Sequence, residues 1–346
     1  MDHPTPSTTA PILPPHVRVG HGPTVFPLAL GCMGMSDMYG PADDAESIAT
    51  IHAALERGPM LIDTGDYYAM GRNELLIGRA LAARPDLRER AVISVKFGAL
   101  RGPDGSWLGM DTRPAAIKNA LAYSLVRLGV DHVDIYRPGR LDPNVPIEDT
   151  VGALAELVRA GYVRAIGLSE VGAETVRRAH AVHPLADLQI EYSLVSRGPE
   201  AKIFPTLAEI GVGVTAYGVL SRGLLSGSRP KSPGDFRAHL PRFAGDNRSR
   251  NDALIEGLNA LASEKRCSAS QLAIAWVLAK GRSPGAPAIV PTLGARTRAQ
   301  LAETLGALAV TLTPDEVARL EATVSPDAVA GTRYPAPAMA HLDSER

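Results

Sequence analysis

The stretch of sequence that decides the fold runs from residue 59 to residue 81 and reads PMLIDTGDYYAMGRNELLIGRAL. Its first seven residues form a short apolar run bounded by glycine, which predicts a buried strand. Apolar residues then recur with a helical period over 74–83, which predicts an amphipathic helix. A buried strand followed directly by a helix is the repeating unit of a parallel sheet that helices cover.

The same strand–helix unit recurs along the chain. We predict strands at 27–31, 59–65, 91–98, 133–136, 163–169, 187–193, 212–218 and 287–294. Helices are predicted at 46–56, 74–83, 113–128, 147–160, from 174, at 201–210, from 251 and at 298–308. Eight such units are the number that closes a (β/α)8 barrel, so the sequence predicts an α/β fold with a single TIM barrel.

Two irregular segments belong to this barrel. Short β-prone runs within 17–26 predict an N-terminal hairpin at the bottom of the barrel, and 223–247 predicts a long loop after strand 7. The competing architecture, an open doubly wound sheet, carries a G-x-G-x-x-G/A turn after its first strand. The near match at 211–216 precedes a strand instead, which disfavours that alternative.

Composition limits the domain organisation and the class of partner. The chain has 346 residues, of which 45% are hydrophobic, as expected for one globular barrel. Five prolines within residues 1–16 predict a disordered arm, followed by the barrel at 17–325 and a C-terminal tail at 326–346. A formal net charge of -1 disfavours nucleic acid or an anionic membrane surface as a partner.

Location is predicted from what the chain lacks. The first sixteen residues show no signal-peptide pattern, and no run approaches the roughly 20 apolar residues that span a bilayer. Two cysteines are too few for a disulfide framework, so we expect a cytoplasmic protein. An oligomer is possible, but nothing in the sequence indicates one.

Charged and phenolic residues stand near the predicted C-terminal ends of the strands, where barrels carry their chemistry. Asp63 and Lys96 lie in otherwise apolar strands, so we expect them to form an ion pair, with structural and catalytic roles equally open. Tyr68 follows in the next loop. A lysine beside it is expected to lower its pKa and to prepare it to give a proton to a carbonyl oxygen.

Six segments resemble the aldo-keto reductase family, in the family's order, over about residues 18–325: LIDTGDYYAMGRNELLIGRAL, VISVKFG, IGLSE, LQIEYSLVSRG, AYGVLSRGLLSG and IVPTLGARTRAQLAE. The resemblance implies NADPH-dependent reduction of a small aldehyde or ketone by hydride transfer. It also implies that Tyr68 is the proton donor, that Lys96 tunes it and that Asp63 holds the lysine. Tyr67 is the rival donor, but it lies one position short of the family spacing.

The resemblance further implies which residues hold NADPH or NADP+. Ser169, Glu170 and Gln189 would bind the nicotinamide carboxamide, and Tyr217 would stack on the ring. Gly218, Leu220 and Arg222 would contact the pyrophosphate. Gly294, Arg296 and Arg298 would bind a phosphate where the last helix begins, and Gln300 and Glu303 would hold the adenine. Two arginines where a helix begins suit the 2′-phosphate of NADPH. No metal site is predicted, because His180 and His183 lack a third ligand.

The chain departs from the family at several positions. Gly139 stands where the family has a catalytic histidine, and Ala69 replaces a glycine after the catalytic tyrosine. Glu170 and Thr304 each replace an asparagine. Arg137, two residues before Gly139 and so on the same strand face, is a candidate replacement for the histidine.

Glycine in place of the family histidine is expected to open space for substrate. Two functions other than carbonyl reduction also remain to be weighed. A soft apolar pocket is expected from Met35, Met38, Tyr39, Trp107 and Gly139. One alternative is a nucleotide-binding regulatory barrel with little or no turnover. Another is oxidation of an alcohol with NADP+. The intact aspartate, tyrosine and lysine favour the reductase.

Overall fold

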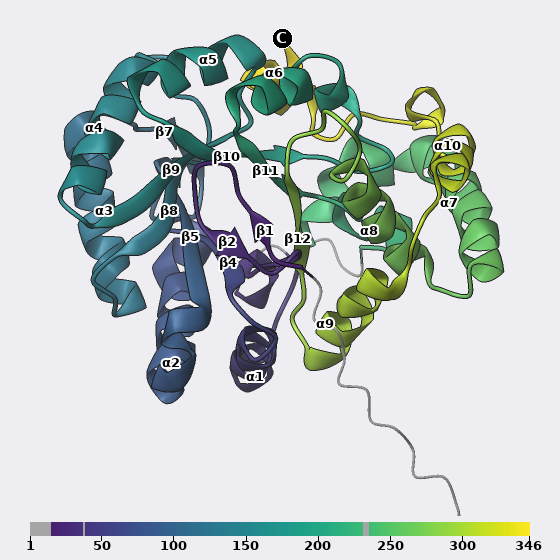
Figure 1. Cartoon of the computed structure of the whole chain (residues 1–346), viewed down its shortest axis with the longest axis horizontal. Coiled ribbons are helices and arrows are strands. Elements are labelled where there is room, and N and C mark those ends of the chain that lie inside the picture. The colour runs from purple at the N-terminus through teal and green to yellow at the C-terminus, as the bar shows by residue number, and fades with distance from the viewer. Residues whose placement is uncertain (1–14, 37–38, 231–234) are drawn as a thin grey trace, which may run out of the picture.

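A computed structural model describes residues 15–36, 39–230 and 235–346 as one closed barrel with helices outside it (Figure 1). Residues 1–14, most of the predicted arm, and the predicted pocket residue Met38 lie outside the described residues.

The barrel wall consists of eight parallel strands, which confirms the predicted (β/α)8 architecture. They are β3 (Ala29–Gly31), β4 (Met60–Gly65), β5 (Ala91–Phe97), β8 (Val133–Pro138), β9 (Val163–Ser169), β10 (Leu185–Glu191), β11 (Gly213–Tyr217) and β12 (Ile289–Gly294). They pair in chain order, and β12 pairs with β3 to close the barrel. Their side chains are almost all buried, as expected for a parallel sheet covered on its outer face.

Helices surround the strands. They are α1 (Asp44–Leu55), α2 (Arg72–Ala83), α3 (Pro114–Leu128), α4 (Ile147–Arg159), α5 (Ala173–Val182), α6 (Ile203–Ile210), α7 (Gly245–Glu264), α8 (Ala269–Lys280), α9 (Arg298–Leu305), α10 (Pro314–Thr323) and α11 (Ala336–Ala340). The first turns of α7 read GDNRSR, which carries no apolar period, and this explains why the sequence predicted a helix only from residue 251.

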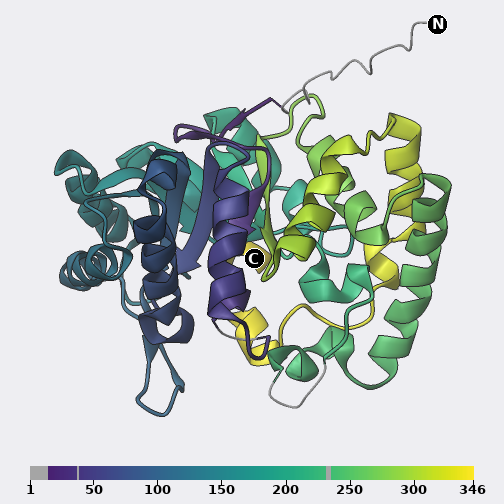
Figure 2. The ribbon, with the colours of Figure 1, turned by 90° about the horizontal axis from the view of Figure 1, so that it is seen from below.

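Two hairpins mark the opposite ends of the barrel (Figure 2). The predicted N-terminal hairpin, β1 (Val17–Arg18) with β2 (Thr24–Val25), closes the bottom, where Val19 and Val25 pack against inward-facing apolar side chains of the strands. Its turn needs Gly20, which has φ 51° and whose added Cβ would lie 2.2 Å from the Ala186 carbonyl oxygen. The second hairpin, β6 (Ala99–Arg101) with β7 (Trp107–Met110), projects from the rim and was not predicted.

A polar layer lies above this apolar floor, inside the barrel. Arg137 on β8 and Asp187 on β10 are fully buried and form an ion pair of 3.0 Å. A Cβ at Gly167, on the strand between them, would lie 2.3 Å from the Asp187 carboxylate and 2.9 Å from the arginine Nε. Glycine at this position therefore gives the buried pair its room.

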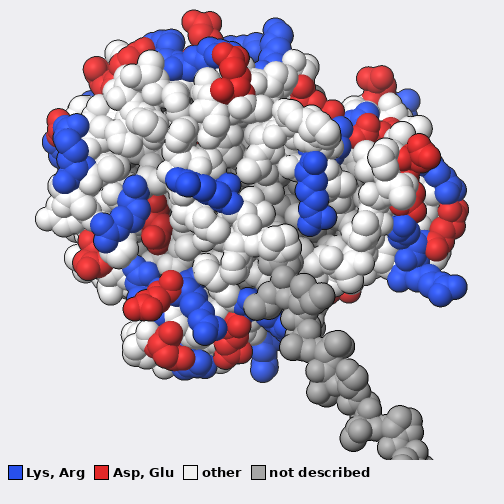
Figure 3. Space-filling model, in the orientation of Figure 1, with Lys and Arg blue, Asp and Glu red and all other residues white. Residues whose placement is uncertain are grey.

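The surface is of mixed charge. On the face that carries the N-terminal hairpin, lysine and arginine are interspersed with aspartate and glutamate (Figure 3). Among the described residues, no helix combines the length and the apolar character needed to cross a membrane.

The loop after β4 has an unusual backbone. Ala69 and Met70 have φ values of 47° and 58°, in the left-handed region. Ala69 thus adopts a conformation that suits the glycine usual in the family. An alanine in this conformation is strained.

We predict that Ala69→Gly raises the free energy of unfolding. The left-handed conformation costs alanine roughly 1–2 kcal/mol, and the extra freedom of unfolded glycine offsets about 0.5–1 kcal/mol of that. Urea denaturation should show a net gain of about 0.5–1 kcal/mol. The control is Ala122→Gly on the exposed face of α3, which should lose about 1 kcal/mol. A loss at both positions would contradict the strain at Ala69.

Candidate functional site

The carboxylate of Asp63 binds three side chains at the C-terminal end of the barrel. It accepts hydrogen bonds from Lys96 Nζ at 2.6 Å and Gln189 Nε2 at 2.8 Å. Ser94 Oγ adds a third at 3.2 Å. The lysine and aspartate side chains are 4% and 8% exposed, so they form the buried ion pair that was predicted from two charged residues in apolar strands.

Tyr68 completes this group from the next loop, with its ring centroid 5.0 Å from Lys96 Nζ. The pKa expectation for Tyr68 is wrong. Burial raises the pKa of its phenol well above the ordinary value; the phenol of Tyr67 and the carboxylate of Asp63 add to the rise, and the Arg140 guanidinium opposes it. Asp63 compensates the lysine charge at 2.6 Å, so little net positive field reaches the phenol.

Arg137, the candidate replacement for the missing histidine, is fully buried below the catalytic candidates. Its guanidinium donates to Ser94 Oγ at 2.9 Å and pairs with Asp187, one layer below the catalytic candidates. Burial raises the pKa of Asp187 to about 6, and the charge of Arg137 opposes the rise.

The histidine position itself is crowded. A Cβ built on Gly139 would lie 2.9 Å from the hydroxyl oxygen of Tyr67. The Tyr67 ring contacts Trp107 of the rim hairpin edge to face, at 5.7 Å between centroids. The space beside Gly139 is thus filled by Tyr67.

Predicted nicotinamide residues contact the C-terminal tail. The Tyr217 hydroxyl lies 2.7 Å from Glu170 Oε1 and 3.1 Å from the hydroxyl of Tyr334. Arg333 pairs with Glu170 through two hydrogen bonds of 2.9 and 2.7 Å. The sequence analysis did not predict the two contacts with the tail, because Tyr334 is 117 positions from Tyr217 and Arg333 is 163 positions from Glu170.

Glu170 itself has a left-handed φ of 55°, a conformation that asparagine tolerates better. Burial raises its pKa, but the hydrogen bonds and charge of Arg333 outweigh burial and hold the pKa at about 2. The carboxylate is therefore ionised and paired, and this pairing accounts for a glutamate where the family has asparagine.

Arg222, predicted to bind pyrophosphate, pairs with buried Glu191 at 2.9 Å and lies over the ring of Tyr334. Its neighbours Gly218 and Leu220 form the start of the same turn, where Gly218 has φ 65°. Arg242 pairs with the same glutamate at 3.4 Å. Sequence reasoning missed both residues. Glu191 lies within a segment that resembles the family but was given no role, and Arg242 lies in the irregular stretch 223–247, outside those segments.

The other end of the predicted cofactor site surrounds the start of α9, just after Gly294. The carboxylate of Glu46 accepts from the backbone N–H of Arg298 at 2.9 Å and from its guanidinium at 2.8 Å. Arg296 donates instead to the carbonyls of Tyr39 and Pro41. A carboxylate thus occupies the helix N-terminus, which is where an anion is favoured.

The two residues predicted to hold the adenine form hydrogen bonds at the starts of different helices. Gln300 stays at the start of α9, where its side chain accepts from the Arg296 backbone N–H at 2.8 Å. Glu303 instead bonds Ser268 and Gln271 at the start of α8.

The predicted pocket residues do not line one common pocket. Met35 is 1% exposed and packs in the core, so it does not face a pocket. Tyr39 packs against Phe236, with ring centroids 5.3 Å apart. Of the predicted pocket residues that the structure describes, only Trp107 and Gly139 lie beside the catalytic candidates, where both contact Tyr67.

The architecture agrees with a family comparison. A model of the aldo/keto reductase family matches residues 27–325. The chain belongs to the aldo-keto reductase family. It is 38% identical over 335 residues to a probable aldo-keto reductase of soybean (Glycine max), covering 94% of this chain and 93% of that protein.

Solved structures of aldo-keto reductases share the fold. The glycerol dehydrogenase of Gluconobacter oxydans is 30% identical with a TM-score of 0.79, over 90% of this chain and 96% of that one. The holo form of an aldo-keto reductase from Bacillus halodurans is 27% identical with a TM-score of 0.73, over 90% and 97%.

Members of the family are NADP-dependent oxidoreductases that act on carbonyl and CH–OH groups, and this chain is such an enzyme with NADP(H) as its cofactor. The donor set at α9 fits a phosphate, since Glu46 stands there as an anion between a helix N-terminus and Arg298. The described residues contain no group of three or more potential metal ligands.

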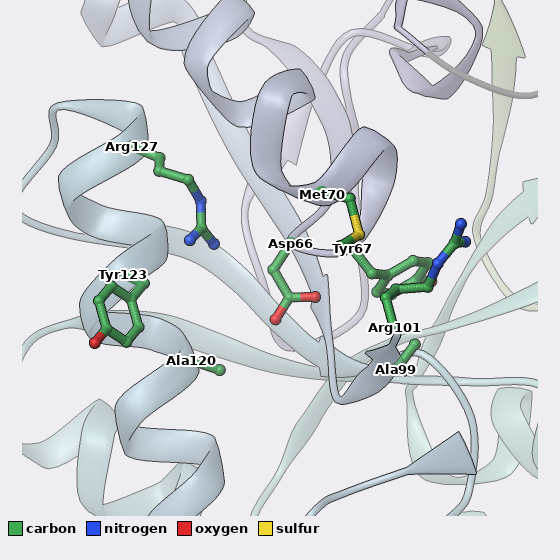
Figure 4. A pocket seen from close by; sticks show the side chains of 8 residues that line it. All are labelled: Asp66, Tyr67, Met70, Ala99, Arg101, Ala120, Tyr123 and Arg127. Carbon is green, nitrogen blue, oxygen red and sulfur yellow. The ribbon is translucent and has the colours of Figure 1, made fainter. Parts of the chain in front are cut away.

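One pocket that the sequence did not predict lies beside Tyr67, between the loop after β4, β6 and α3 (Figure 4). Its volume is about 240 Å³, and Asp66, Arg101 and Arg127 contribute charged side chains to its wall. Burial raises the pKa of Asp66 to about 7; the Glu74 carboxylate adds to the rise and the Arg127 guanidinium opposes it.

This raised pKa predicts a pH-dependent stability difference between the wild type and Asp66→Asn. Between about pH 4 and 7 the folded protein holds a proton on Asp66 that the unfolded chain releases, so wild-type stability falls as pH rises through this range. The asparagine variant lacks that loss. Its stability relative to wild type should increase by on the order of 2 kcal/mol from pH 5 to pH 8.

Urea denaturation at pH 5, 6, 7 and 8 measures this difference. Asp315→Asn, at an exposed position in the first turn of α10, is the matched control for removing one carboxylate. A pH-independent difference at Asp66 would show that its carboxyl is ionised throughout.

Proposed function

We propose that the protein reduces a small aldehyde or ketone to an alcohol with NADPH, and that Tyr68 donates the proton. The observation that carries the proposal is the group of Asp63, Lys96 and Tyr68 at the C-terminal end of the barrel. Among the described residues the Tyr68 hydroxyl has no hydrogen-bond partner, so it is available to a carbonyl oxygen. Bound NADPH supplies the hydride.

The raised pKa of Tyr68 suits this role. A phenol that keeps its proton at neutral pH is a donor, and the acidity it needs arises as the carbonyl oxygen gains negative charge. Lys96 lies 5.0 Å from the centroid of the Tyr68 ring, so the part of its charge that Asp63 leaves uncompensated favours the phenolate that proton transfer produces. Gln189 donates to the other oxygen of Asp63, so the carboxylate that holds the lysine is itself held on both sides.

The reverse reaction is the second candidate, since the Gluconobacter relative is a glycerol dehydrogenase. The same residues serve it, with the tyrosine phenolate accepting the proton of an alcohol. The regulatory barrel is the third, favoured by the contacts of Arg333 and Tyr334 with predicted nicotinamide residues.

Tyr68→Phe tests the proposed reductase. Removing the phenol hydroxyl should lower kcat by about 10²–10⁴-fold, the usual contribution of a general acid. NADPH oxidation at 340 nm measures turnover against a panel of aldehydes and ketones that includes pyridoxal. NADP+ with an alcohol panel tests the reverse direction.

Tyr162→Phe, at an exposed residue that is 50% accessible at the far end of the barrel, is the control and should keep full activity. Binding of NADPH without turnover on either panel would place the regulatory barrel first. Full activity of Tyr68→Phe would assign the proton to another group.

Cofactor preference tests the anion site at α9. Arg298→Ala should raise the KM for NADPH by about 10–100-fold, because a hydrogen bond to a charged group contributes roughly 1.5–3 kcal/mol. The KM for NADH should change little, since NADH lacks the 2′-phosphate. Arg319→Ala is the control, as Arg319 forms the same kind of exposed pair with Glu264. Equal effects on both cofactors would show that Arg298 does not bind the 2′-phosphate.

A further inference from the structure

The hydroxyl of Tyr67 lies in the volume where a side chain at residue 139 would begin. An added Cβ there would lie 2.9 Å from the Tyr67 oxygen and 3.2 Å from its Cε1. Gly139 is not among the residues with positive φ, so its backbone would accept other residue types. Contact with Tyr67, rather than backbone conformation, is therefore what requires glycine.

Tyr67 and Tyr68 stand as neighbours at the barrel mouth. Their rings pack edge to face with centroids 5.0 Å apart, and both lie about the same distance from Gly65, whose Cβ would be 3.4 Å from each ring. The same guanidinium, that of Arg140, faces both phenols and lowers the pKa of each against the rise caused by burial. The two phenols thus share one electrostatic environment.

Neither phenol hydroxyl has a hydrogen-bond partner within the described ranges 15–36, 39–230 and 235–346. Partly buried donors usually have a partner in the working state of a protein. The Tyr67 ring is held on two sides, by Tyr68 and by Trp107. Its hydroxyl is therefore positioned and still free to donate.

We propose that Tyr67 is a second catalytic residue, which donates a hydrogen bond to the substrate carbonyl oxygen from the place that the family's histidine would fill. This inference rests on the proposed reductase function. A carbonyl oxygen has two lone pairs, so it can accept from Tyr68 and Tyr67 together. Hydride adds to the carbon, the C=O π electrons move to oxygen, and Tyr68 gives that oxygen its proton. Tyr67 keeps its own proton and stabilises the developing charge.

The two nearby arginines are committed elsewhere. Arg140 donates to the Gly139 carbonyl at 2.6 Å and to the hydroxyl of Tyr334 at 3.2 Å. Arg137 is fully buried and paired with Asp187 in the layer below, although its Nε and Nη1 have no hydrogen-bond partner among the described residues. Tyr67 is the hydroxyl donor that lies directly beside Gly139.

Tyr67→Phe tests the proposal, because it removes the hydroxyl and keeps both ring contacts. We expect kcat to fall by about 10²–10³-fold, as for the loss of one oxyanion donor, with the dissociation constant for NADPH unchanged. Tyr162→Phe again serves as the control. Wild-type kcat in Tyr67→Phe, alongside an inactive Tyr68→Phe, would overturn the role of Tyr67 and leave the reductase function standing.

A binding measurement separates this failure from failure of the reductase function, because it needs no turnover. Benzamide offers the same carbonyl acceptor and is not reduced. Its affinity for the enzyme with NADPH, followed by cofactor fluorescence, should fall by about 5–10-fold in Tyr67→Phe, as expected for one hydrogen bond of about 1 kcal/mol. Unchanged benzamide affinity would overturn the proposal even if no substrate were found.

Replacement of the donor provides a rescue test. Tyr67→Ala removes the ring that excludes a side chain at residue 139, and adding Gly139→His then restores a donor to the same space. The double variant should recover at least tenfold in kcat over Tyr67→Ala alone. Circular dichroism checks that both variants fold. No recovery, in a folded double variant, would contradict the shared position of the two groups.

Discussion

The rest of the site depends on the hydrogen bonds and the ion pair that the buried carboxylate of Asp63 forms. This carboxylate accepts hydrogen bonds from Lys96, Gln189 and Ser94. The Ser94 hydroxyl in turn accepts a hydrogen bond from Arg137, which is paired with buried Asp187. A charge in the middle of a barrel is stable only when donors surround it, and here two strands, β5 and β10, supply them. The apolar floor beneath, closed by the N-terminal hairpin, leaves these groups no access to water from below. Because Asp63 also compensates the charge of Lys96, the pKa of the Tyr68 phenol stays high and the phenol remains protonated.

A second set of charges organises the rim between β9 and β11. Glu170 and Glu191 are both buried, and Arg333, Arg222 and Arg242 surround them. These cations hold the pKa of both carboxyls below the ordinary value, in spite of burial. The rim is thus a network in which the tail, the loop after β11 and the end of β9 are held together by charge.

The sequence predicted what depends on local pattern. Each barrel strand is a short apolar run and each helix has its own period, so all eight units were found. The β6–β7 hairpin was missed because its residues, exposed around Trp107, show no alternation of buried and exposed positions. The ion pair of Asp63 and Lys96 followed from the cost of burying a charge. The Glu170 and Arg333 pair did not, because its partners are 163 positions apart. The pKa of Tyr68 was mispredicted because it depends on how completely Asp63 compensates the charge of Lys96. That compensation depends on the distance between the two side chains, which the sequence does not contain.

The end of the chain is part of the rim. The backbone N–H of Gly172 donates to Asp343, and Ser344 bonds both the carboxylate and the carbonyl of Glu170. The first described residues lie at the opposite, hairpin end of the barrel (Figure 2). An affinity tag or fusion partner attached after Arg346 would therefore begin next to the residues predicted to hold the nicotinamide. Protein produced for kinetics and crystallisation should carry such additions at the N-terminus, where the barrel floor separates them from the candidate site.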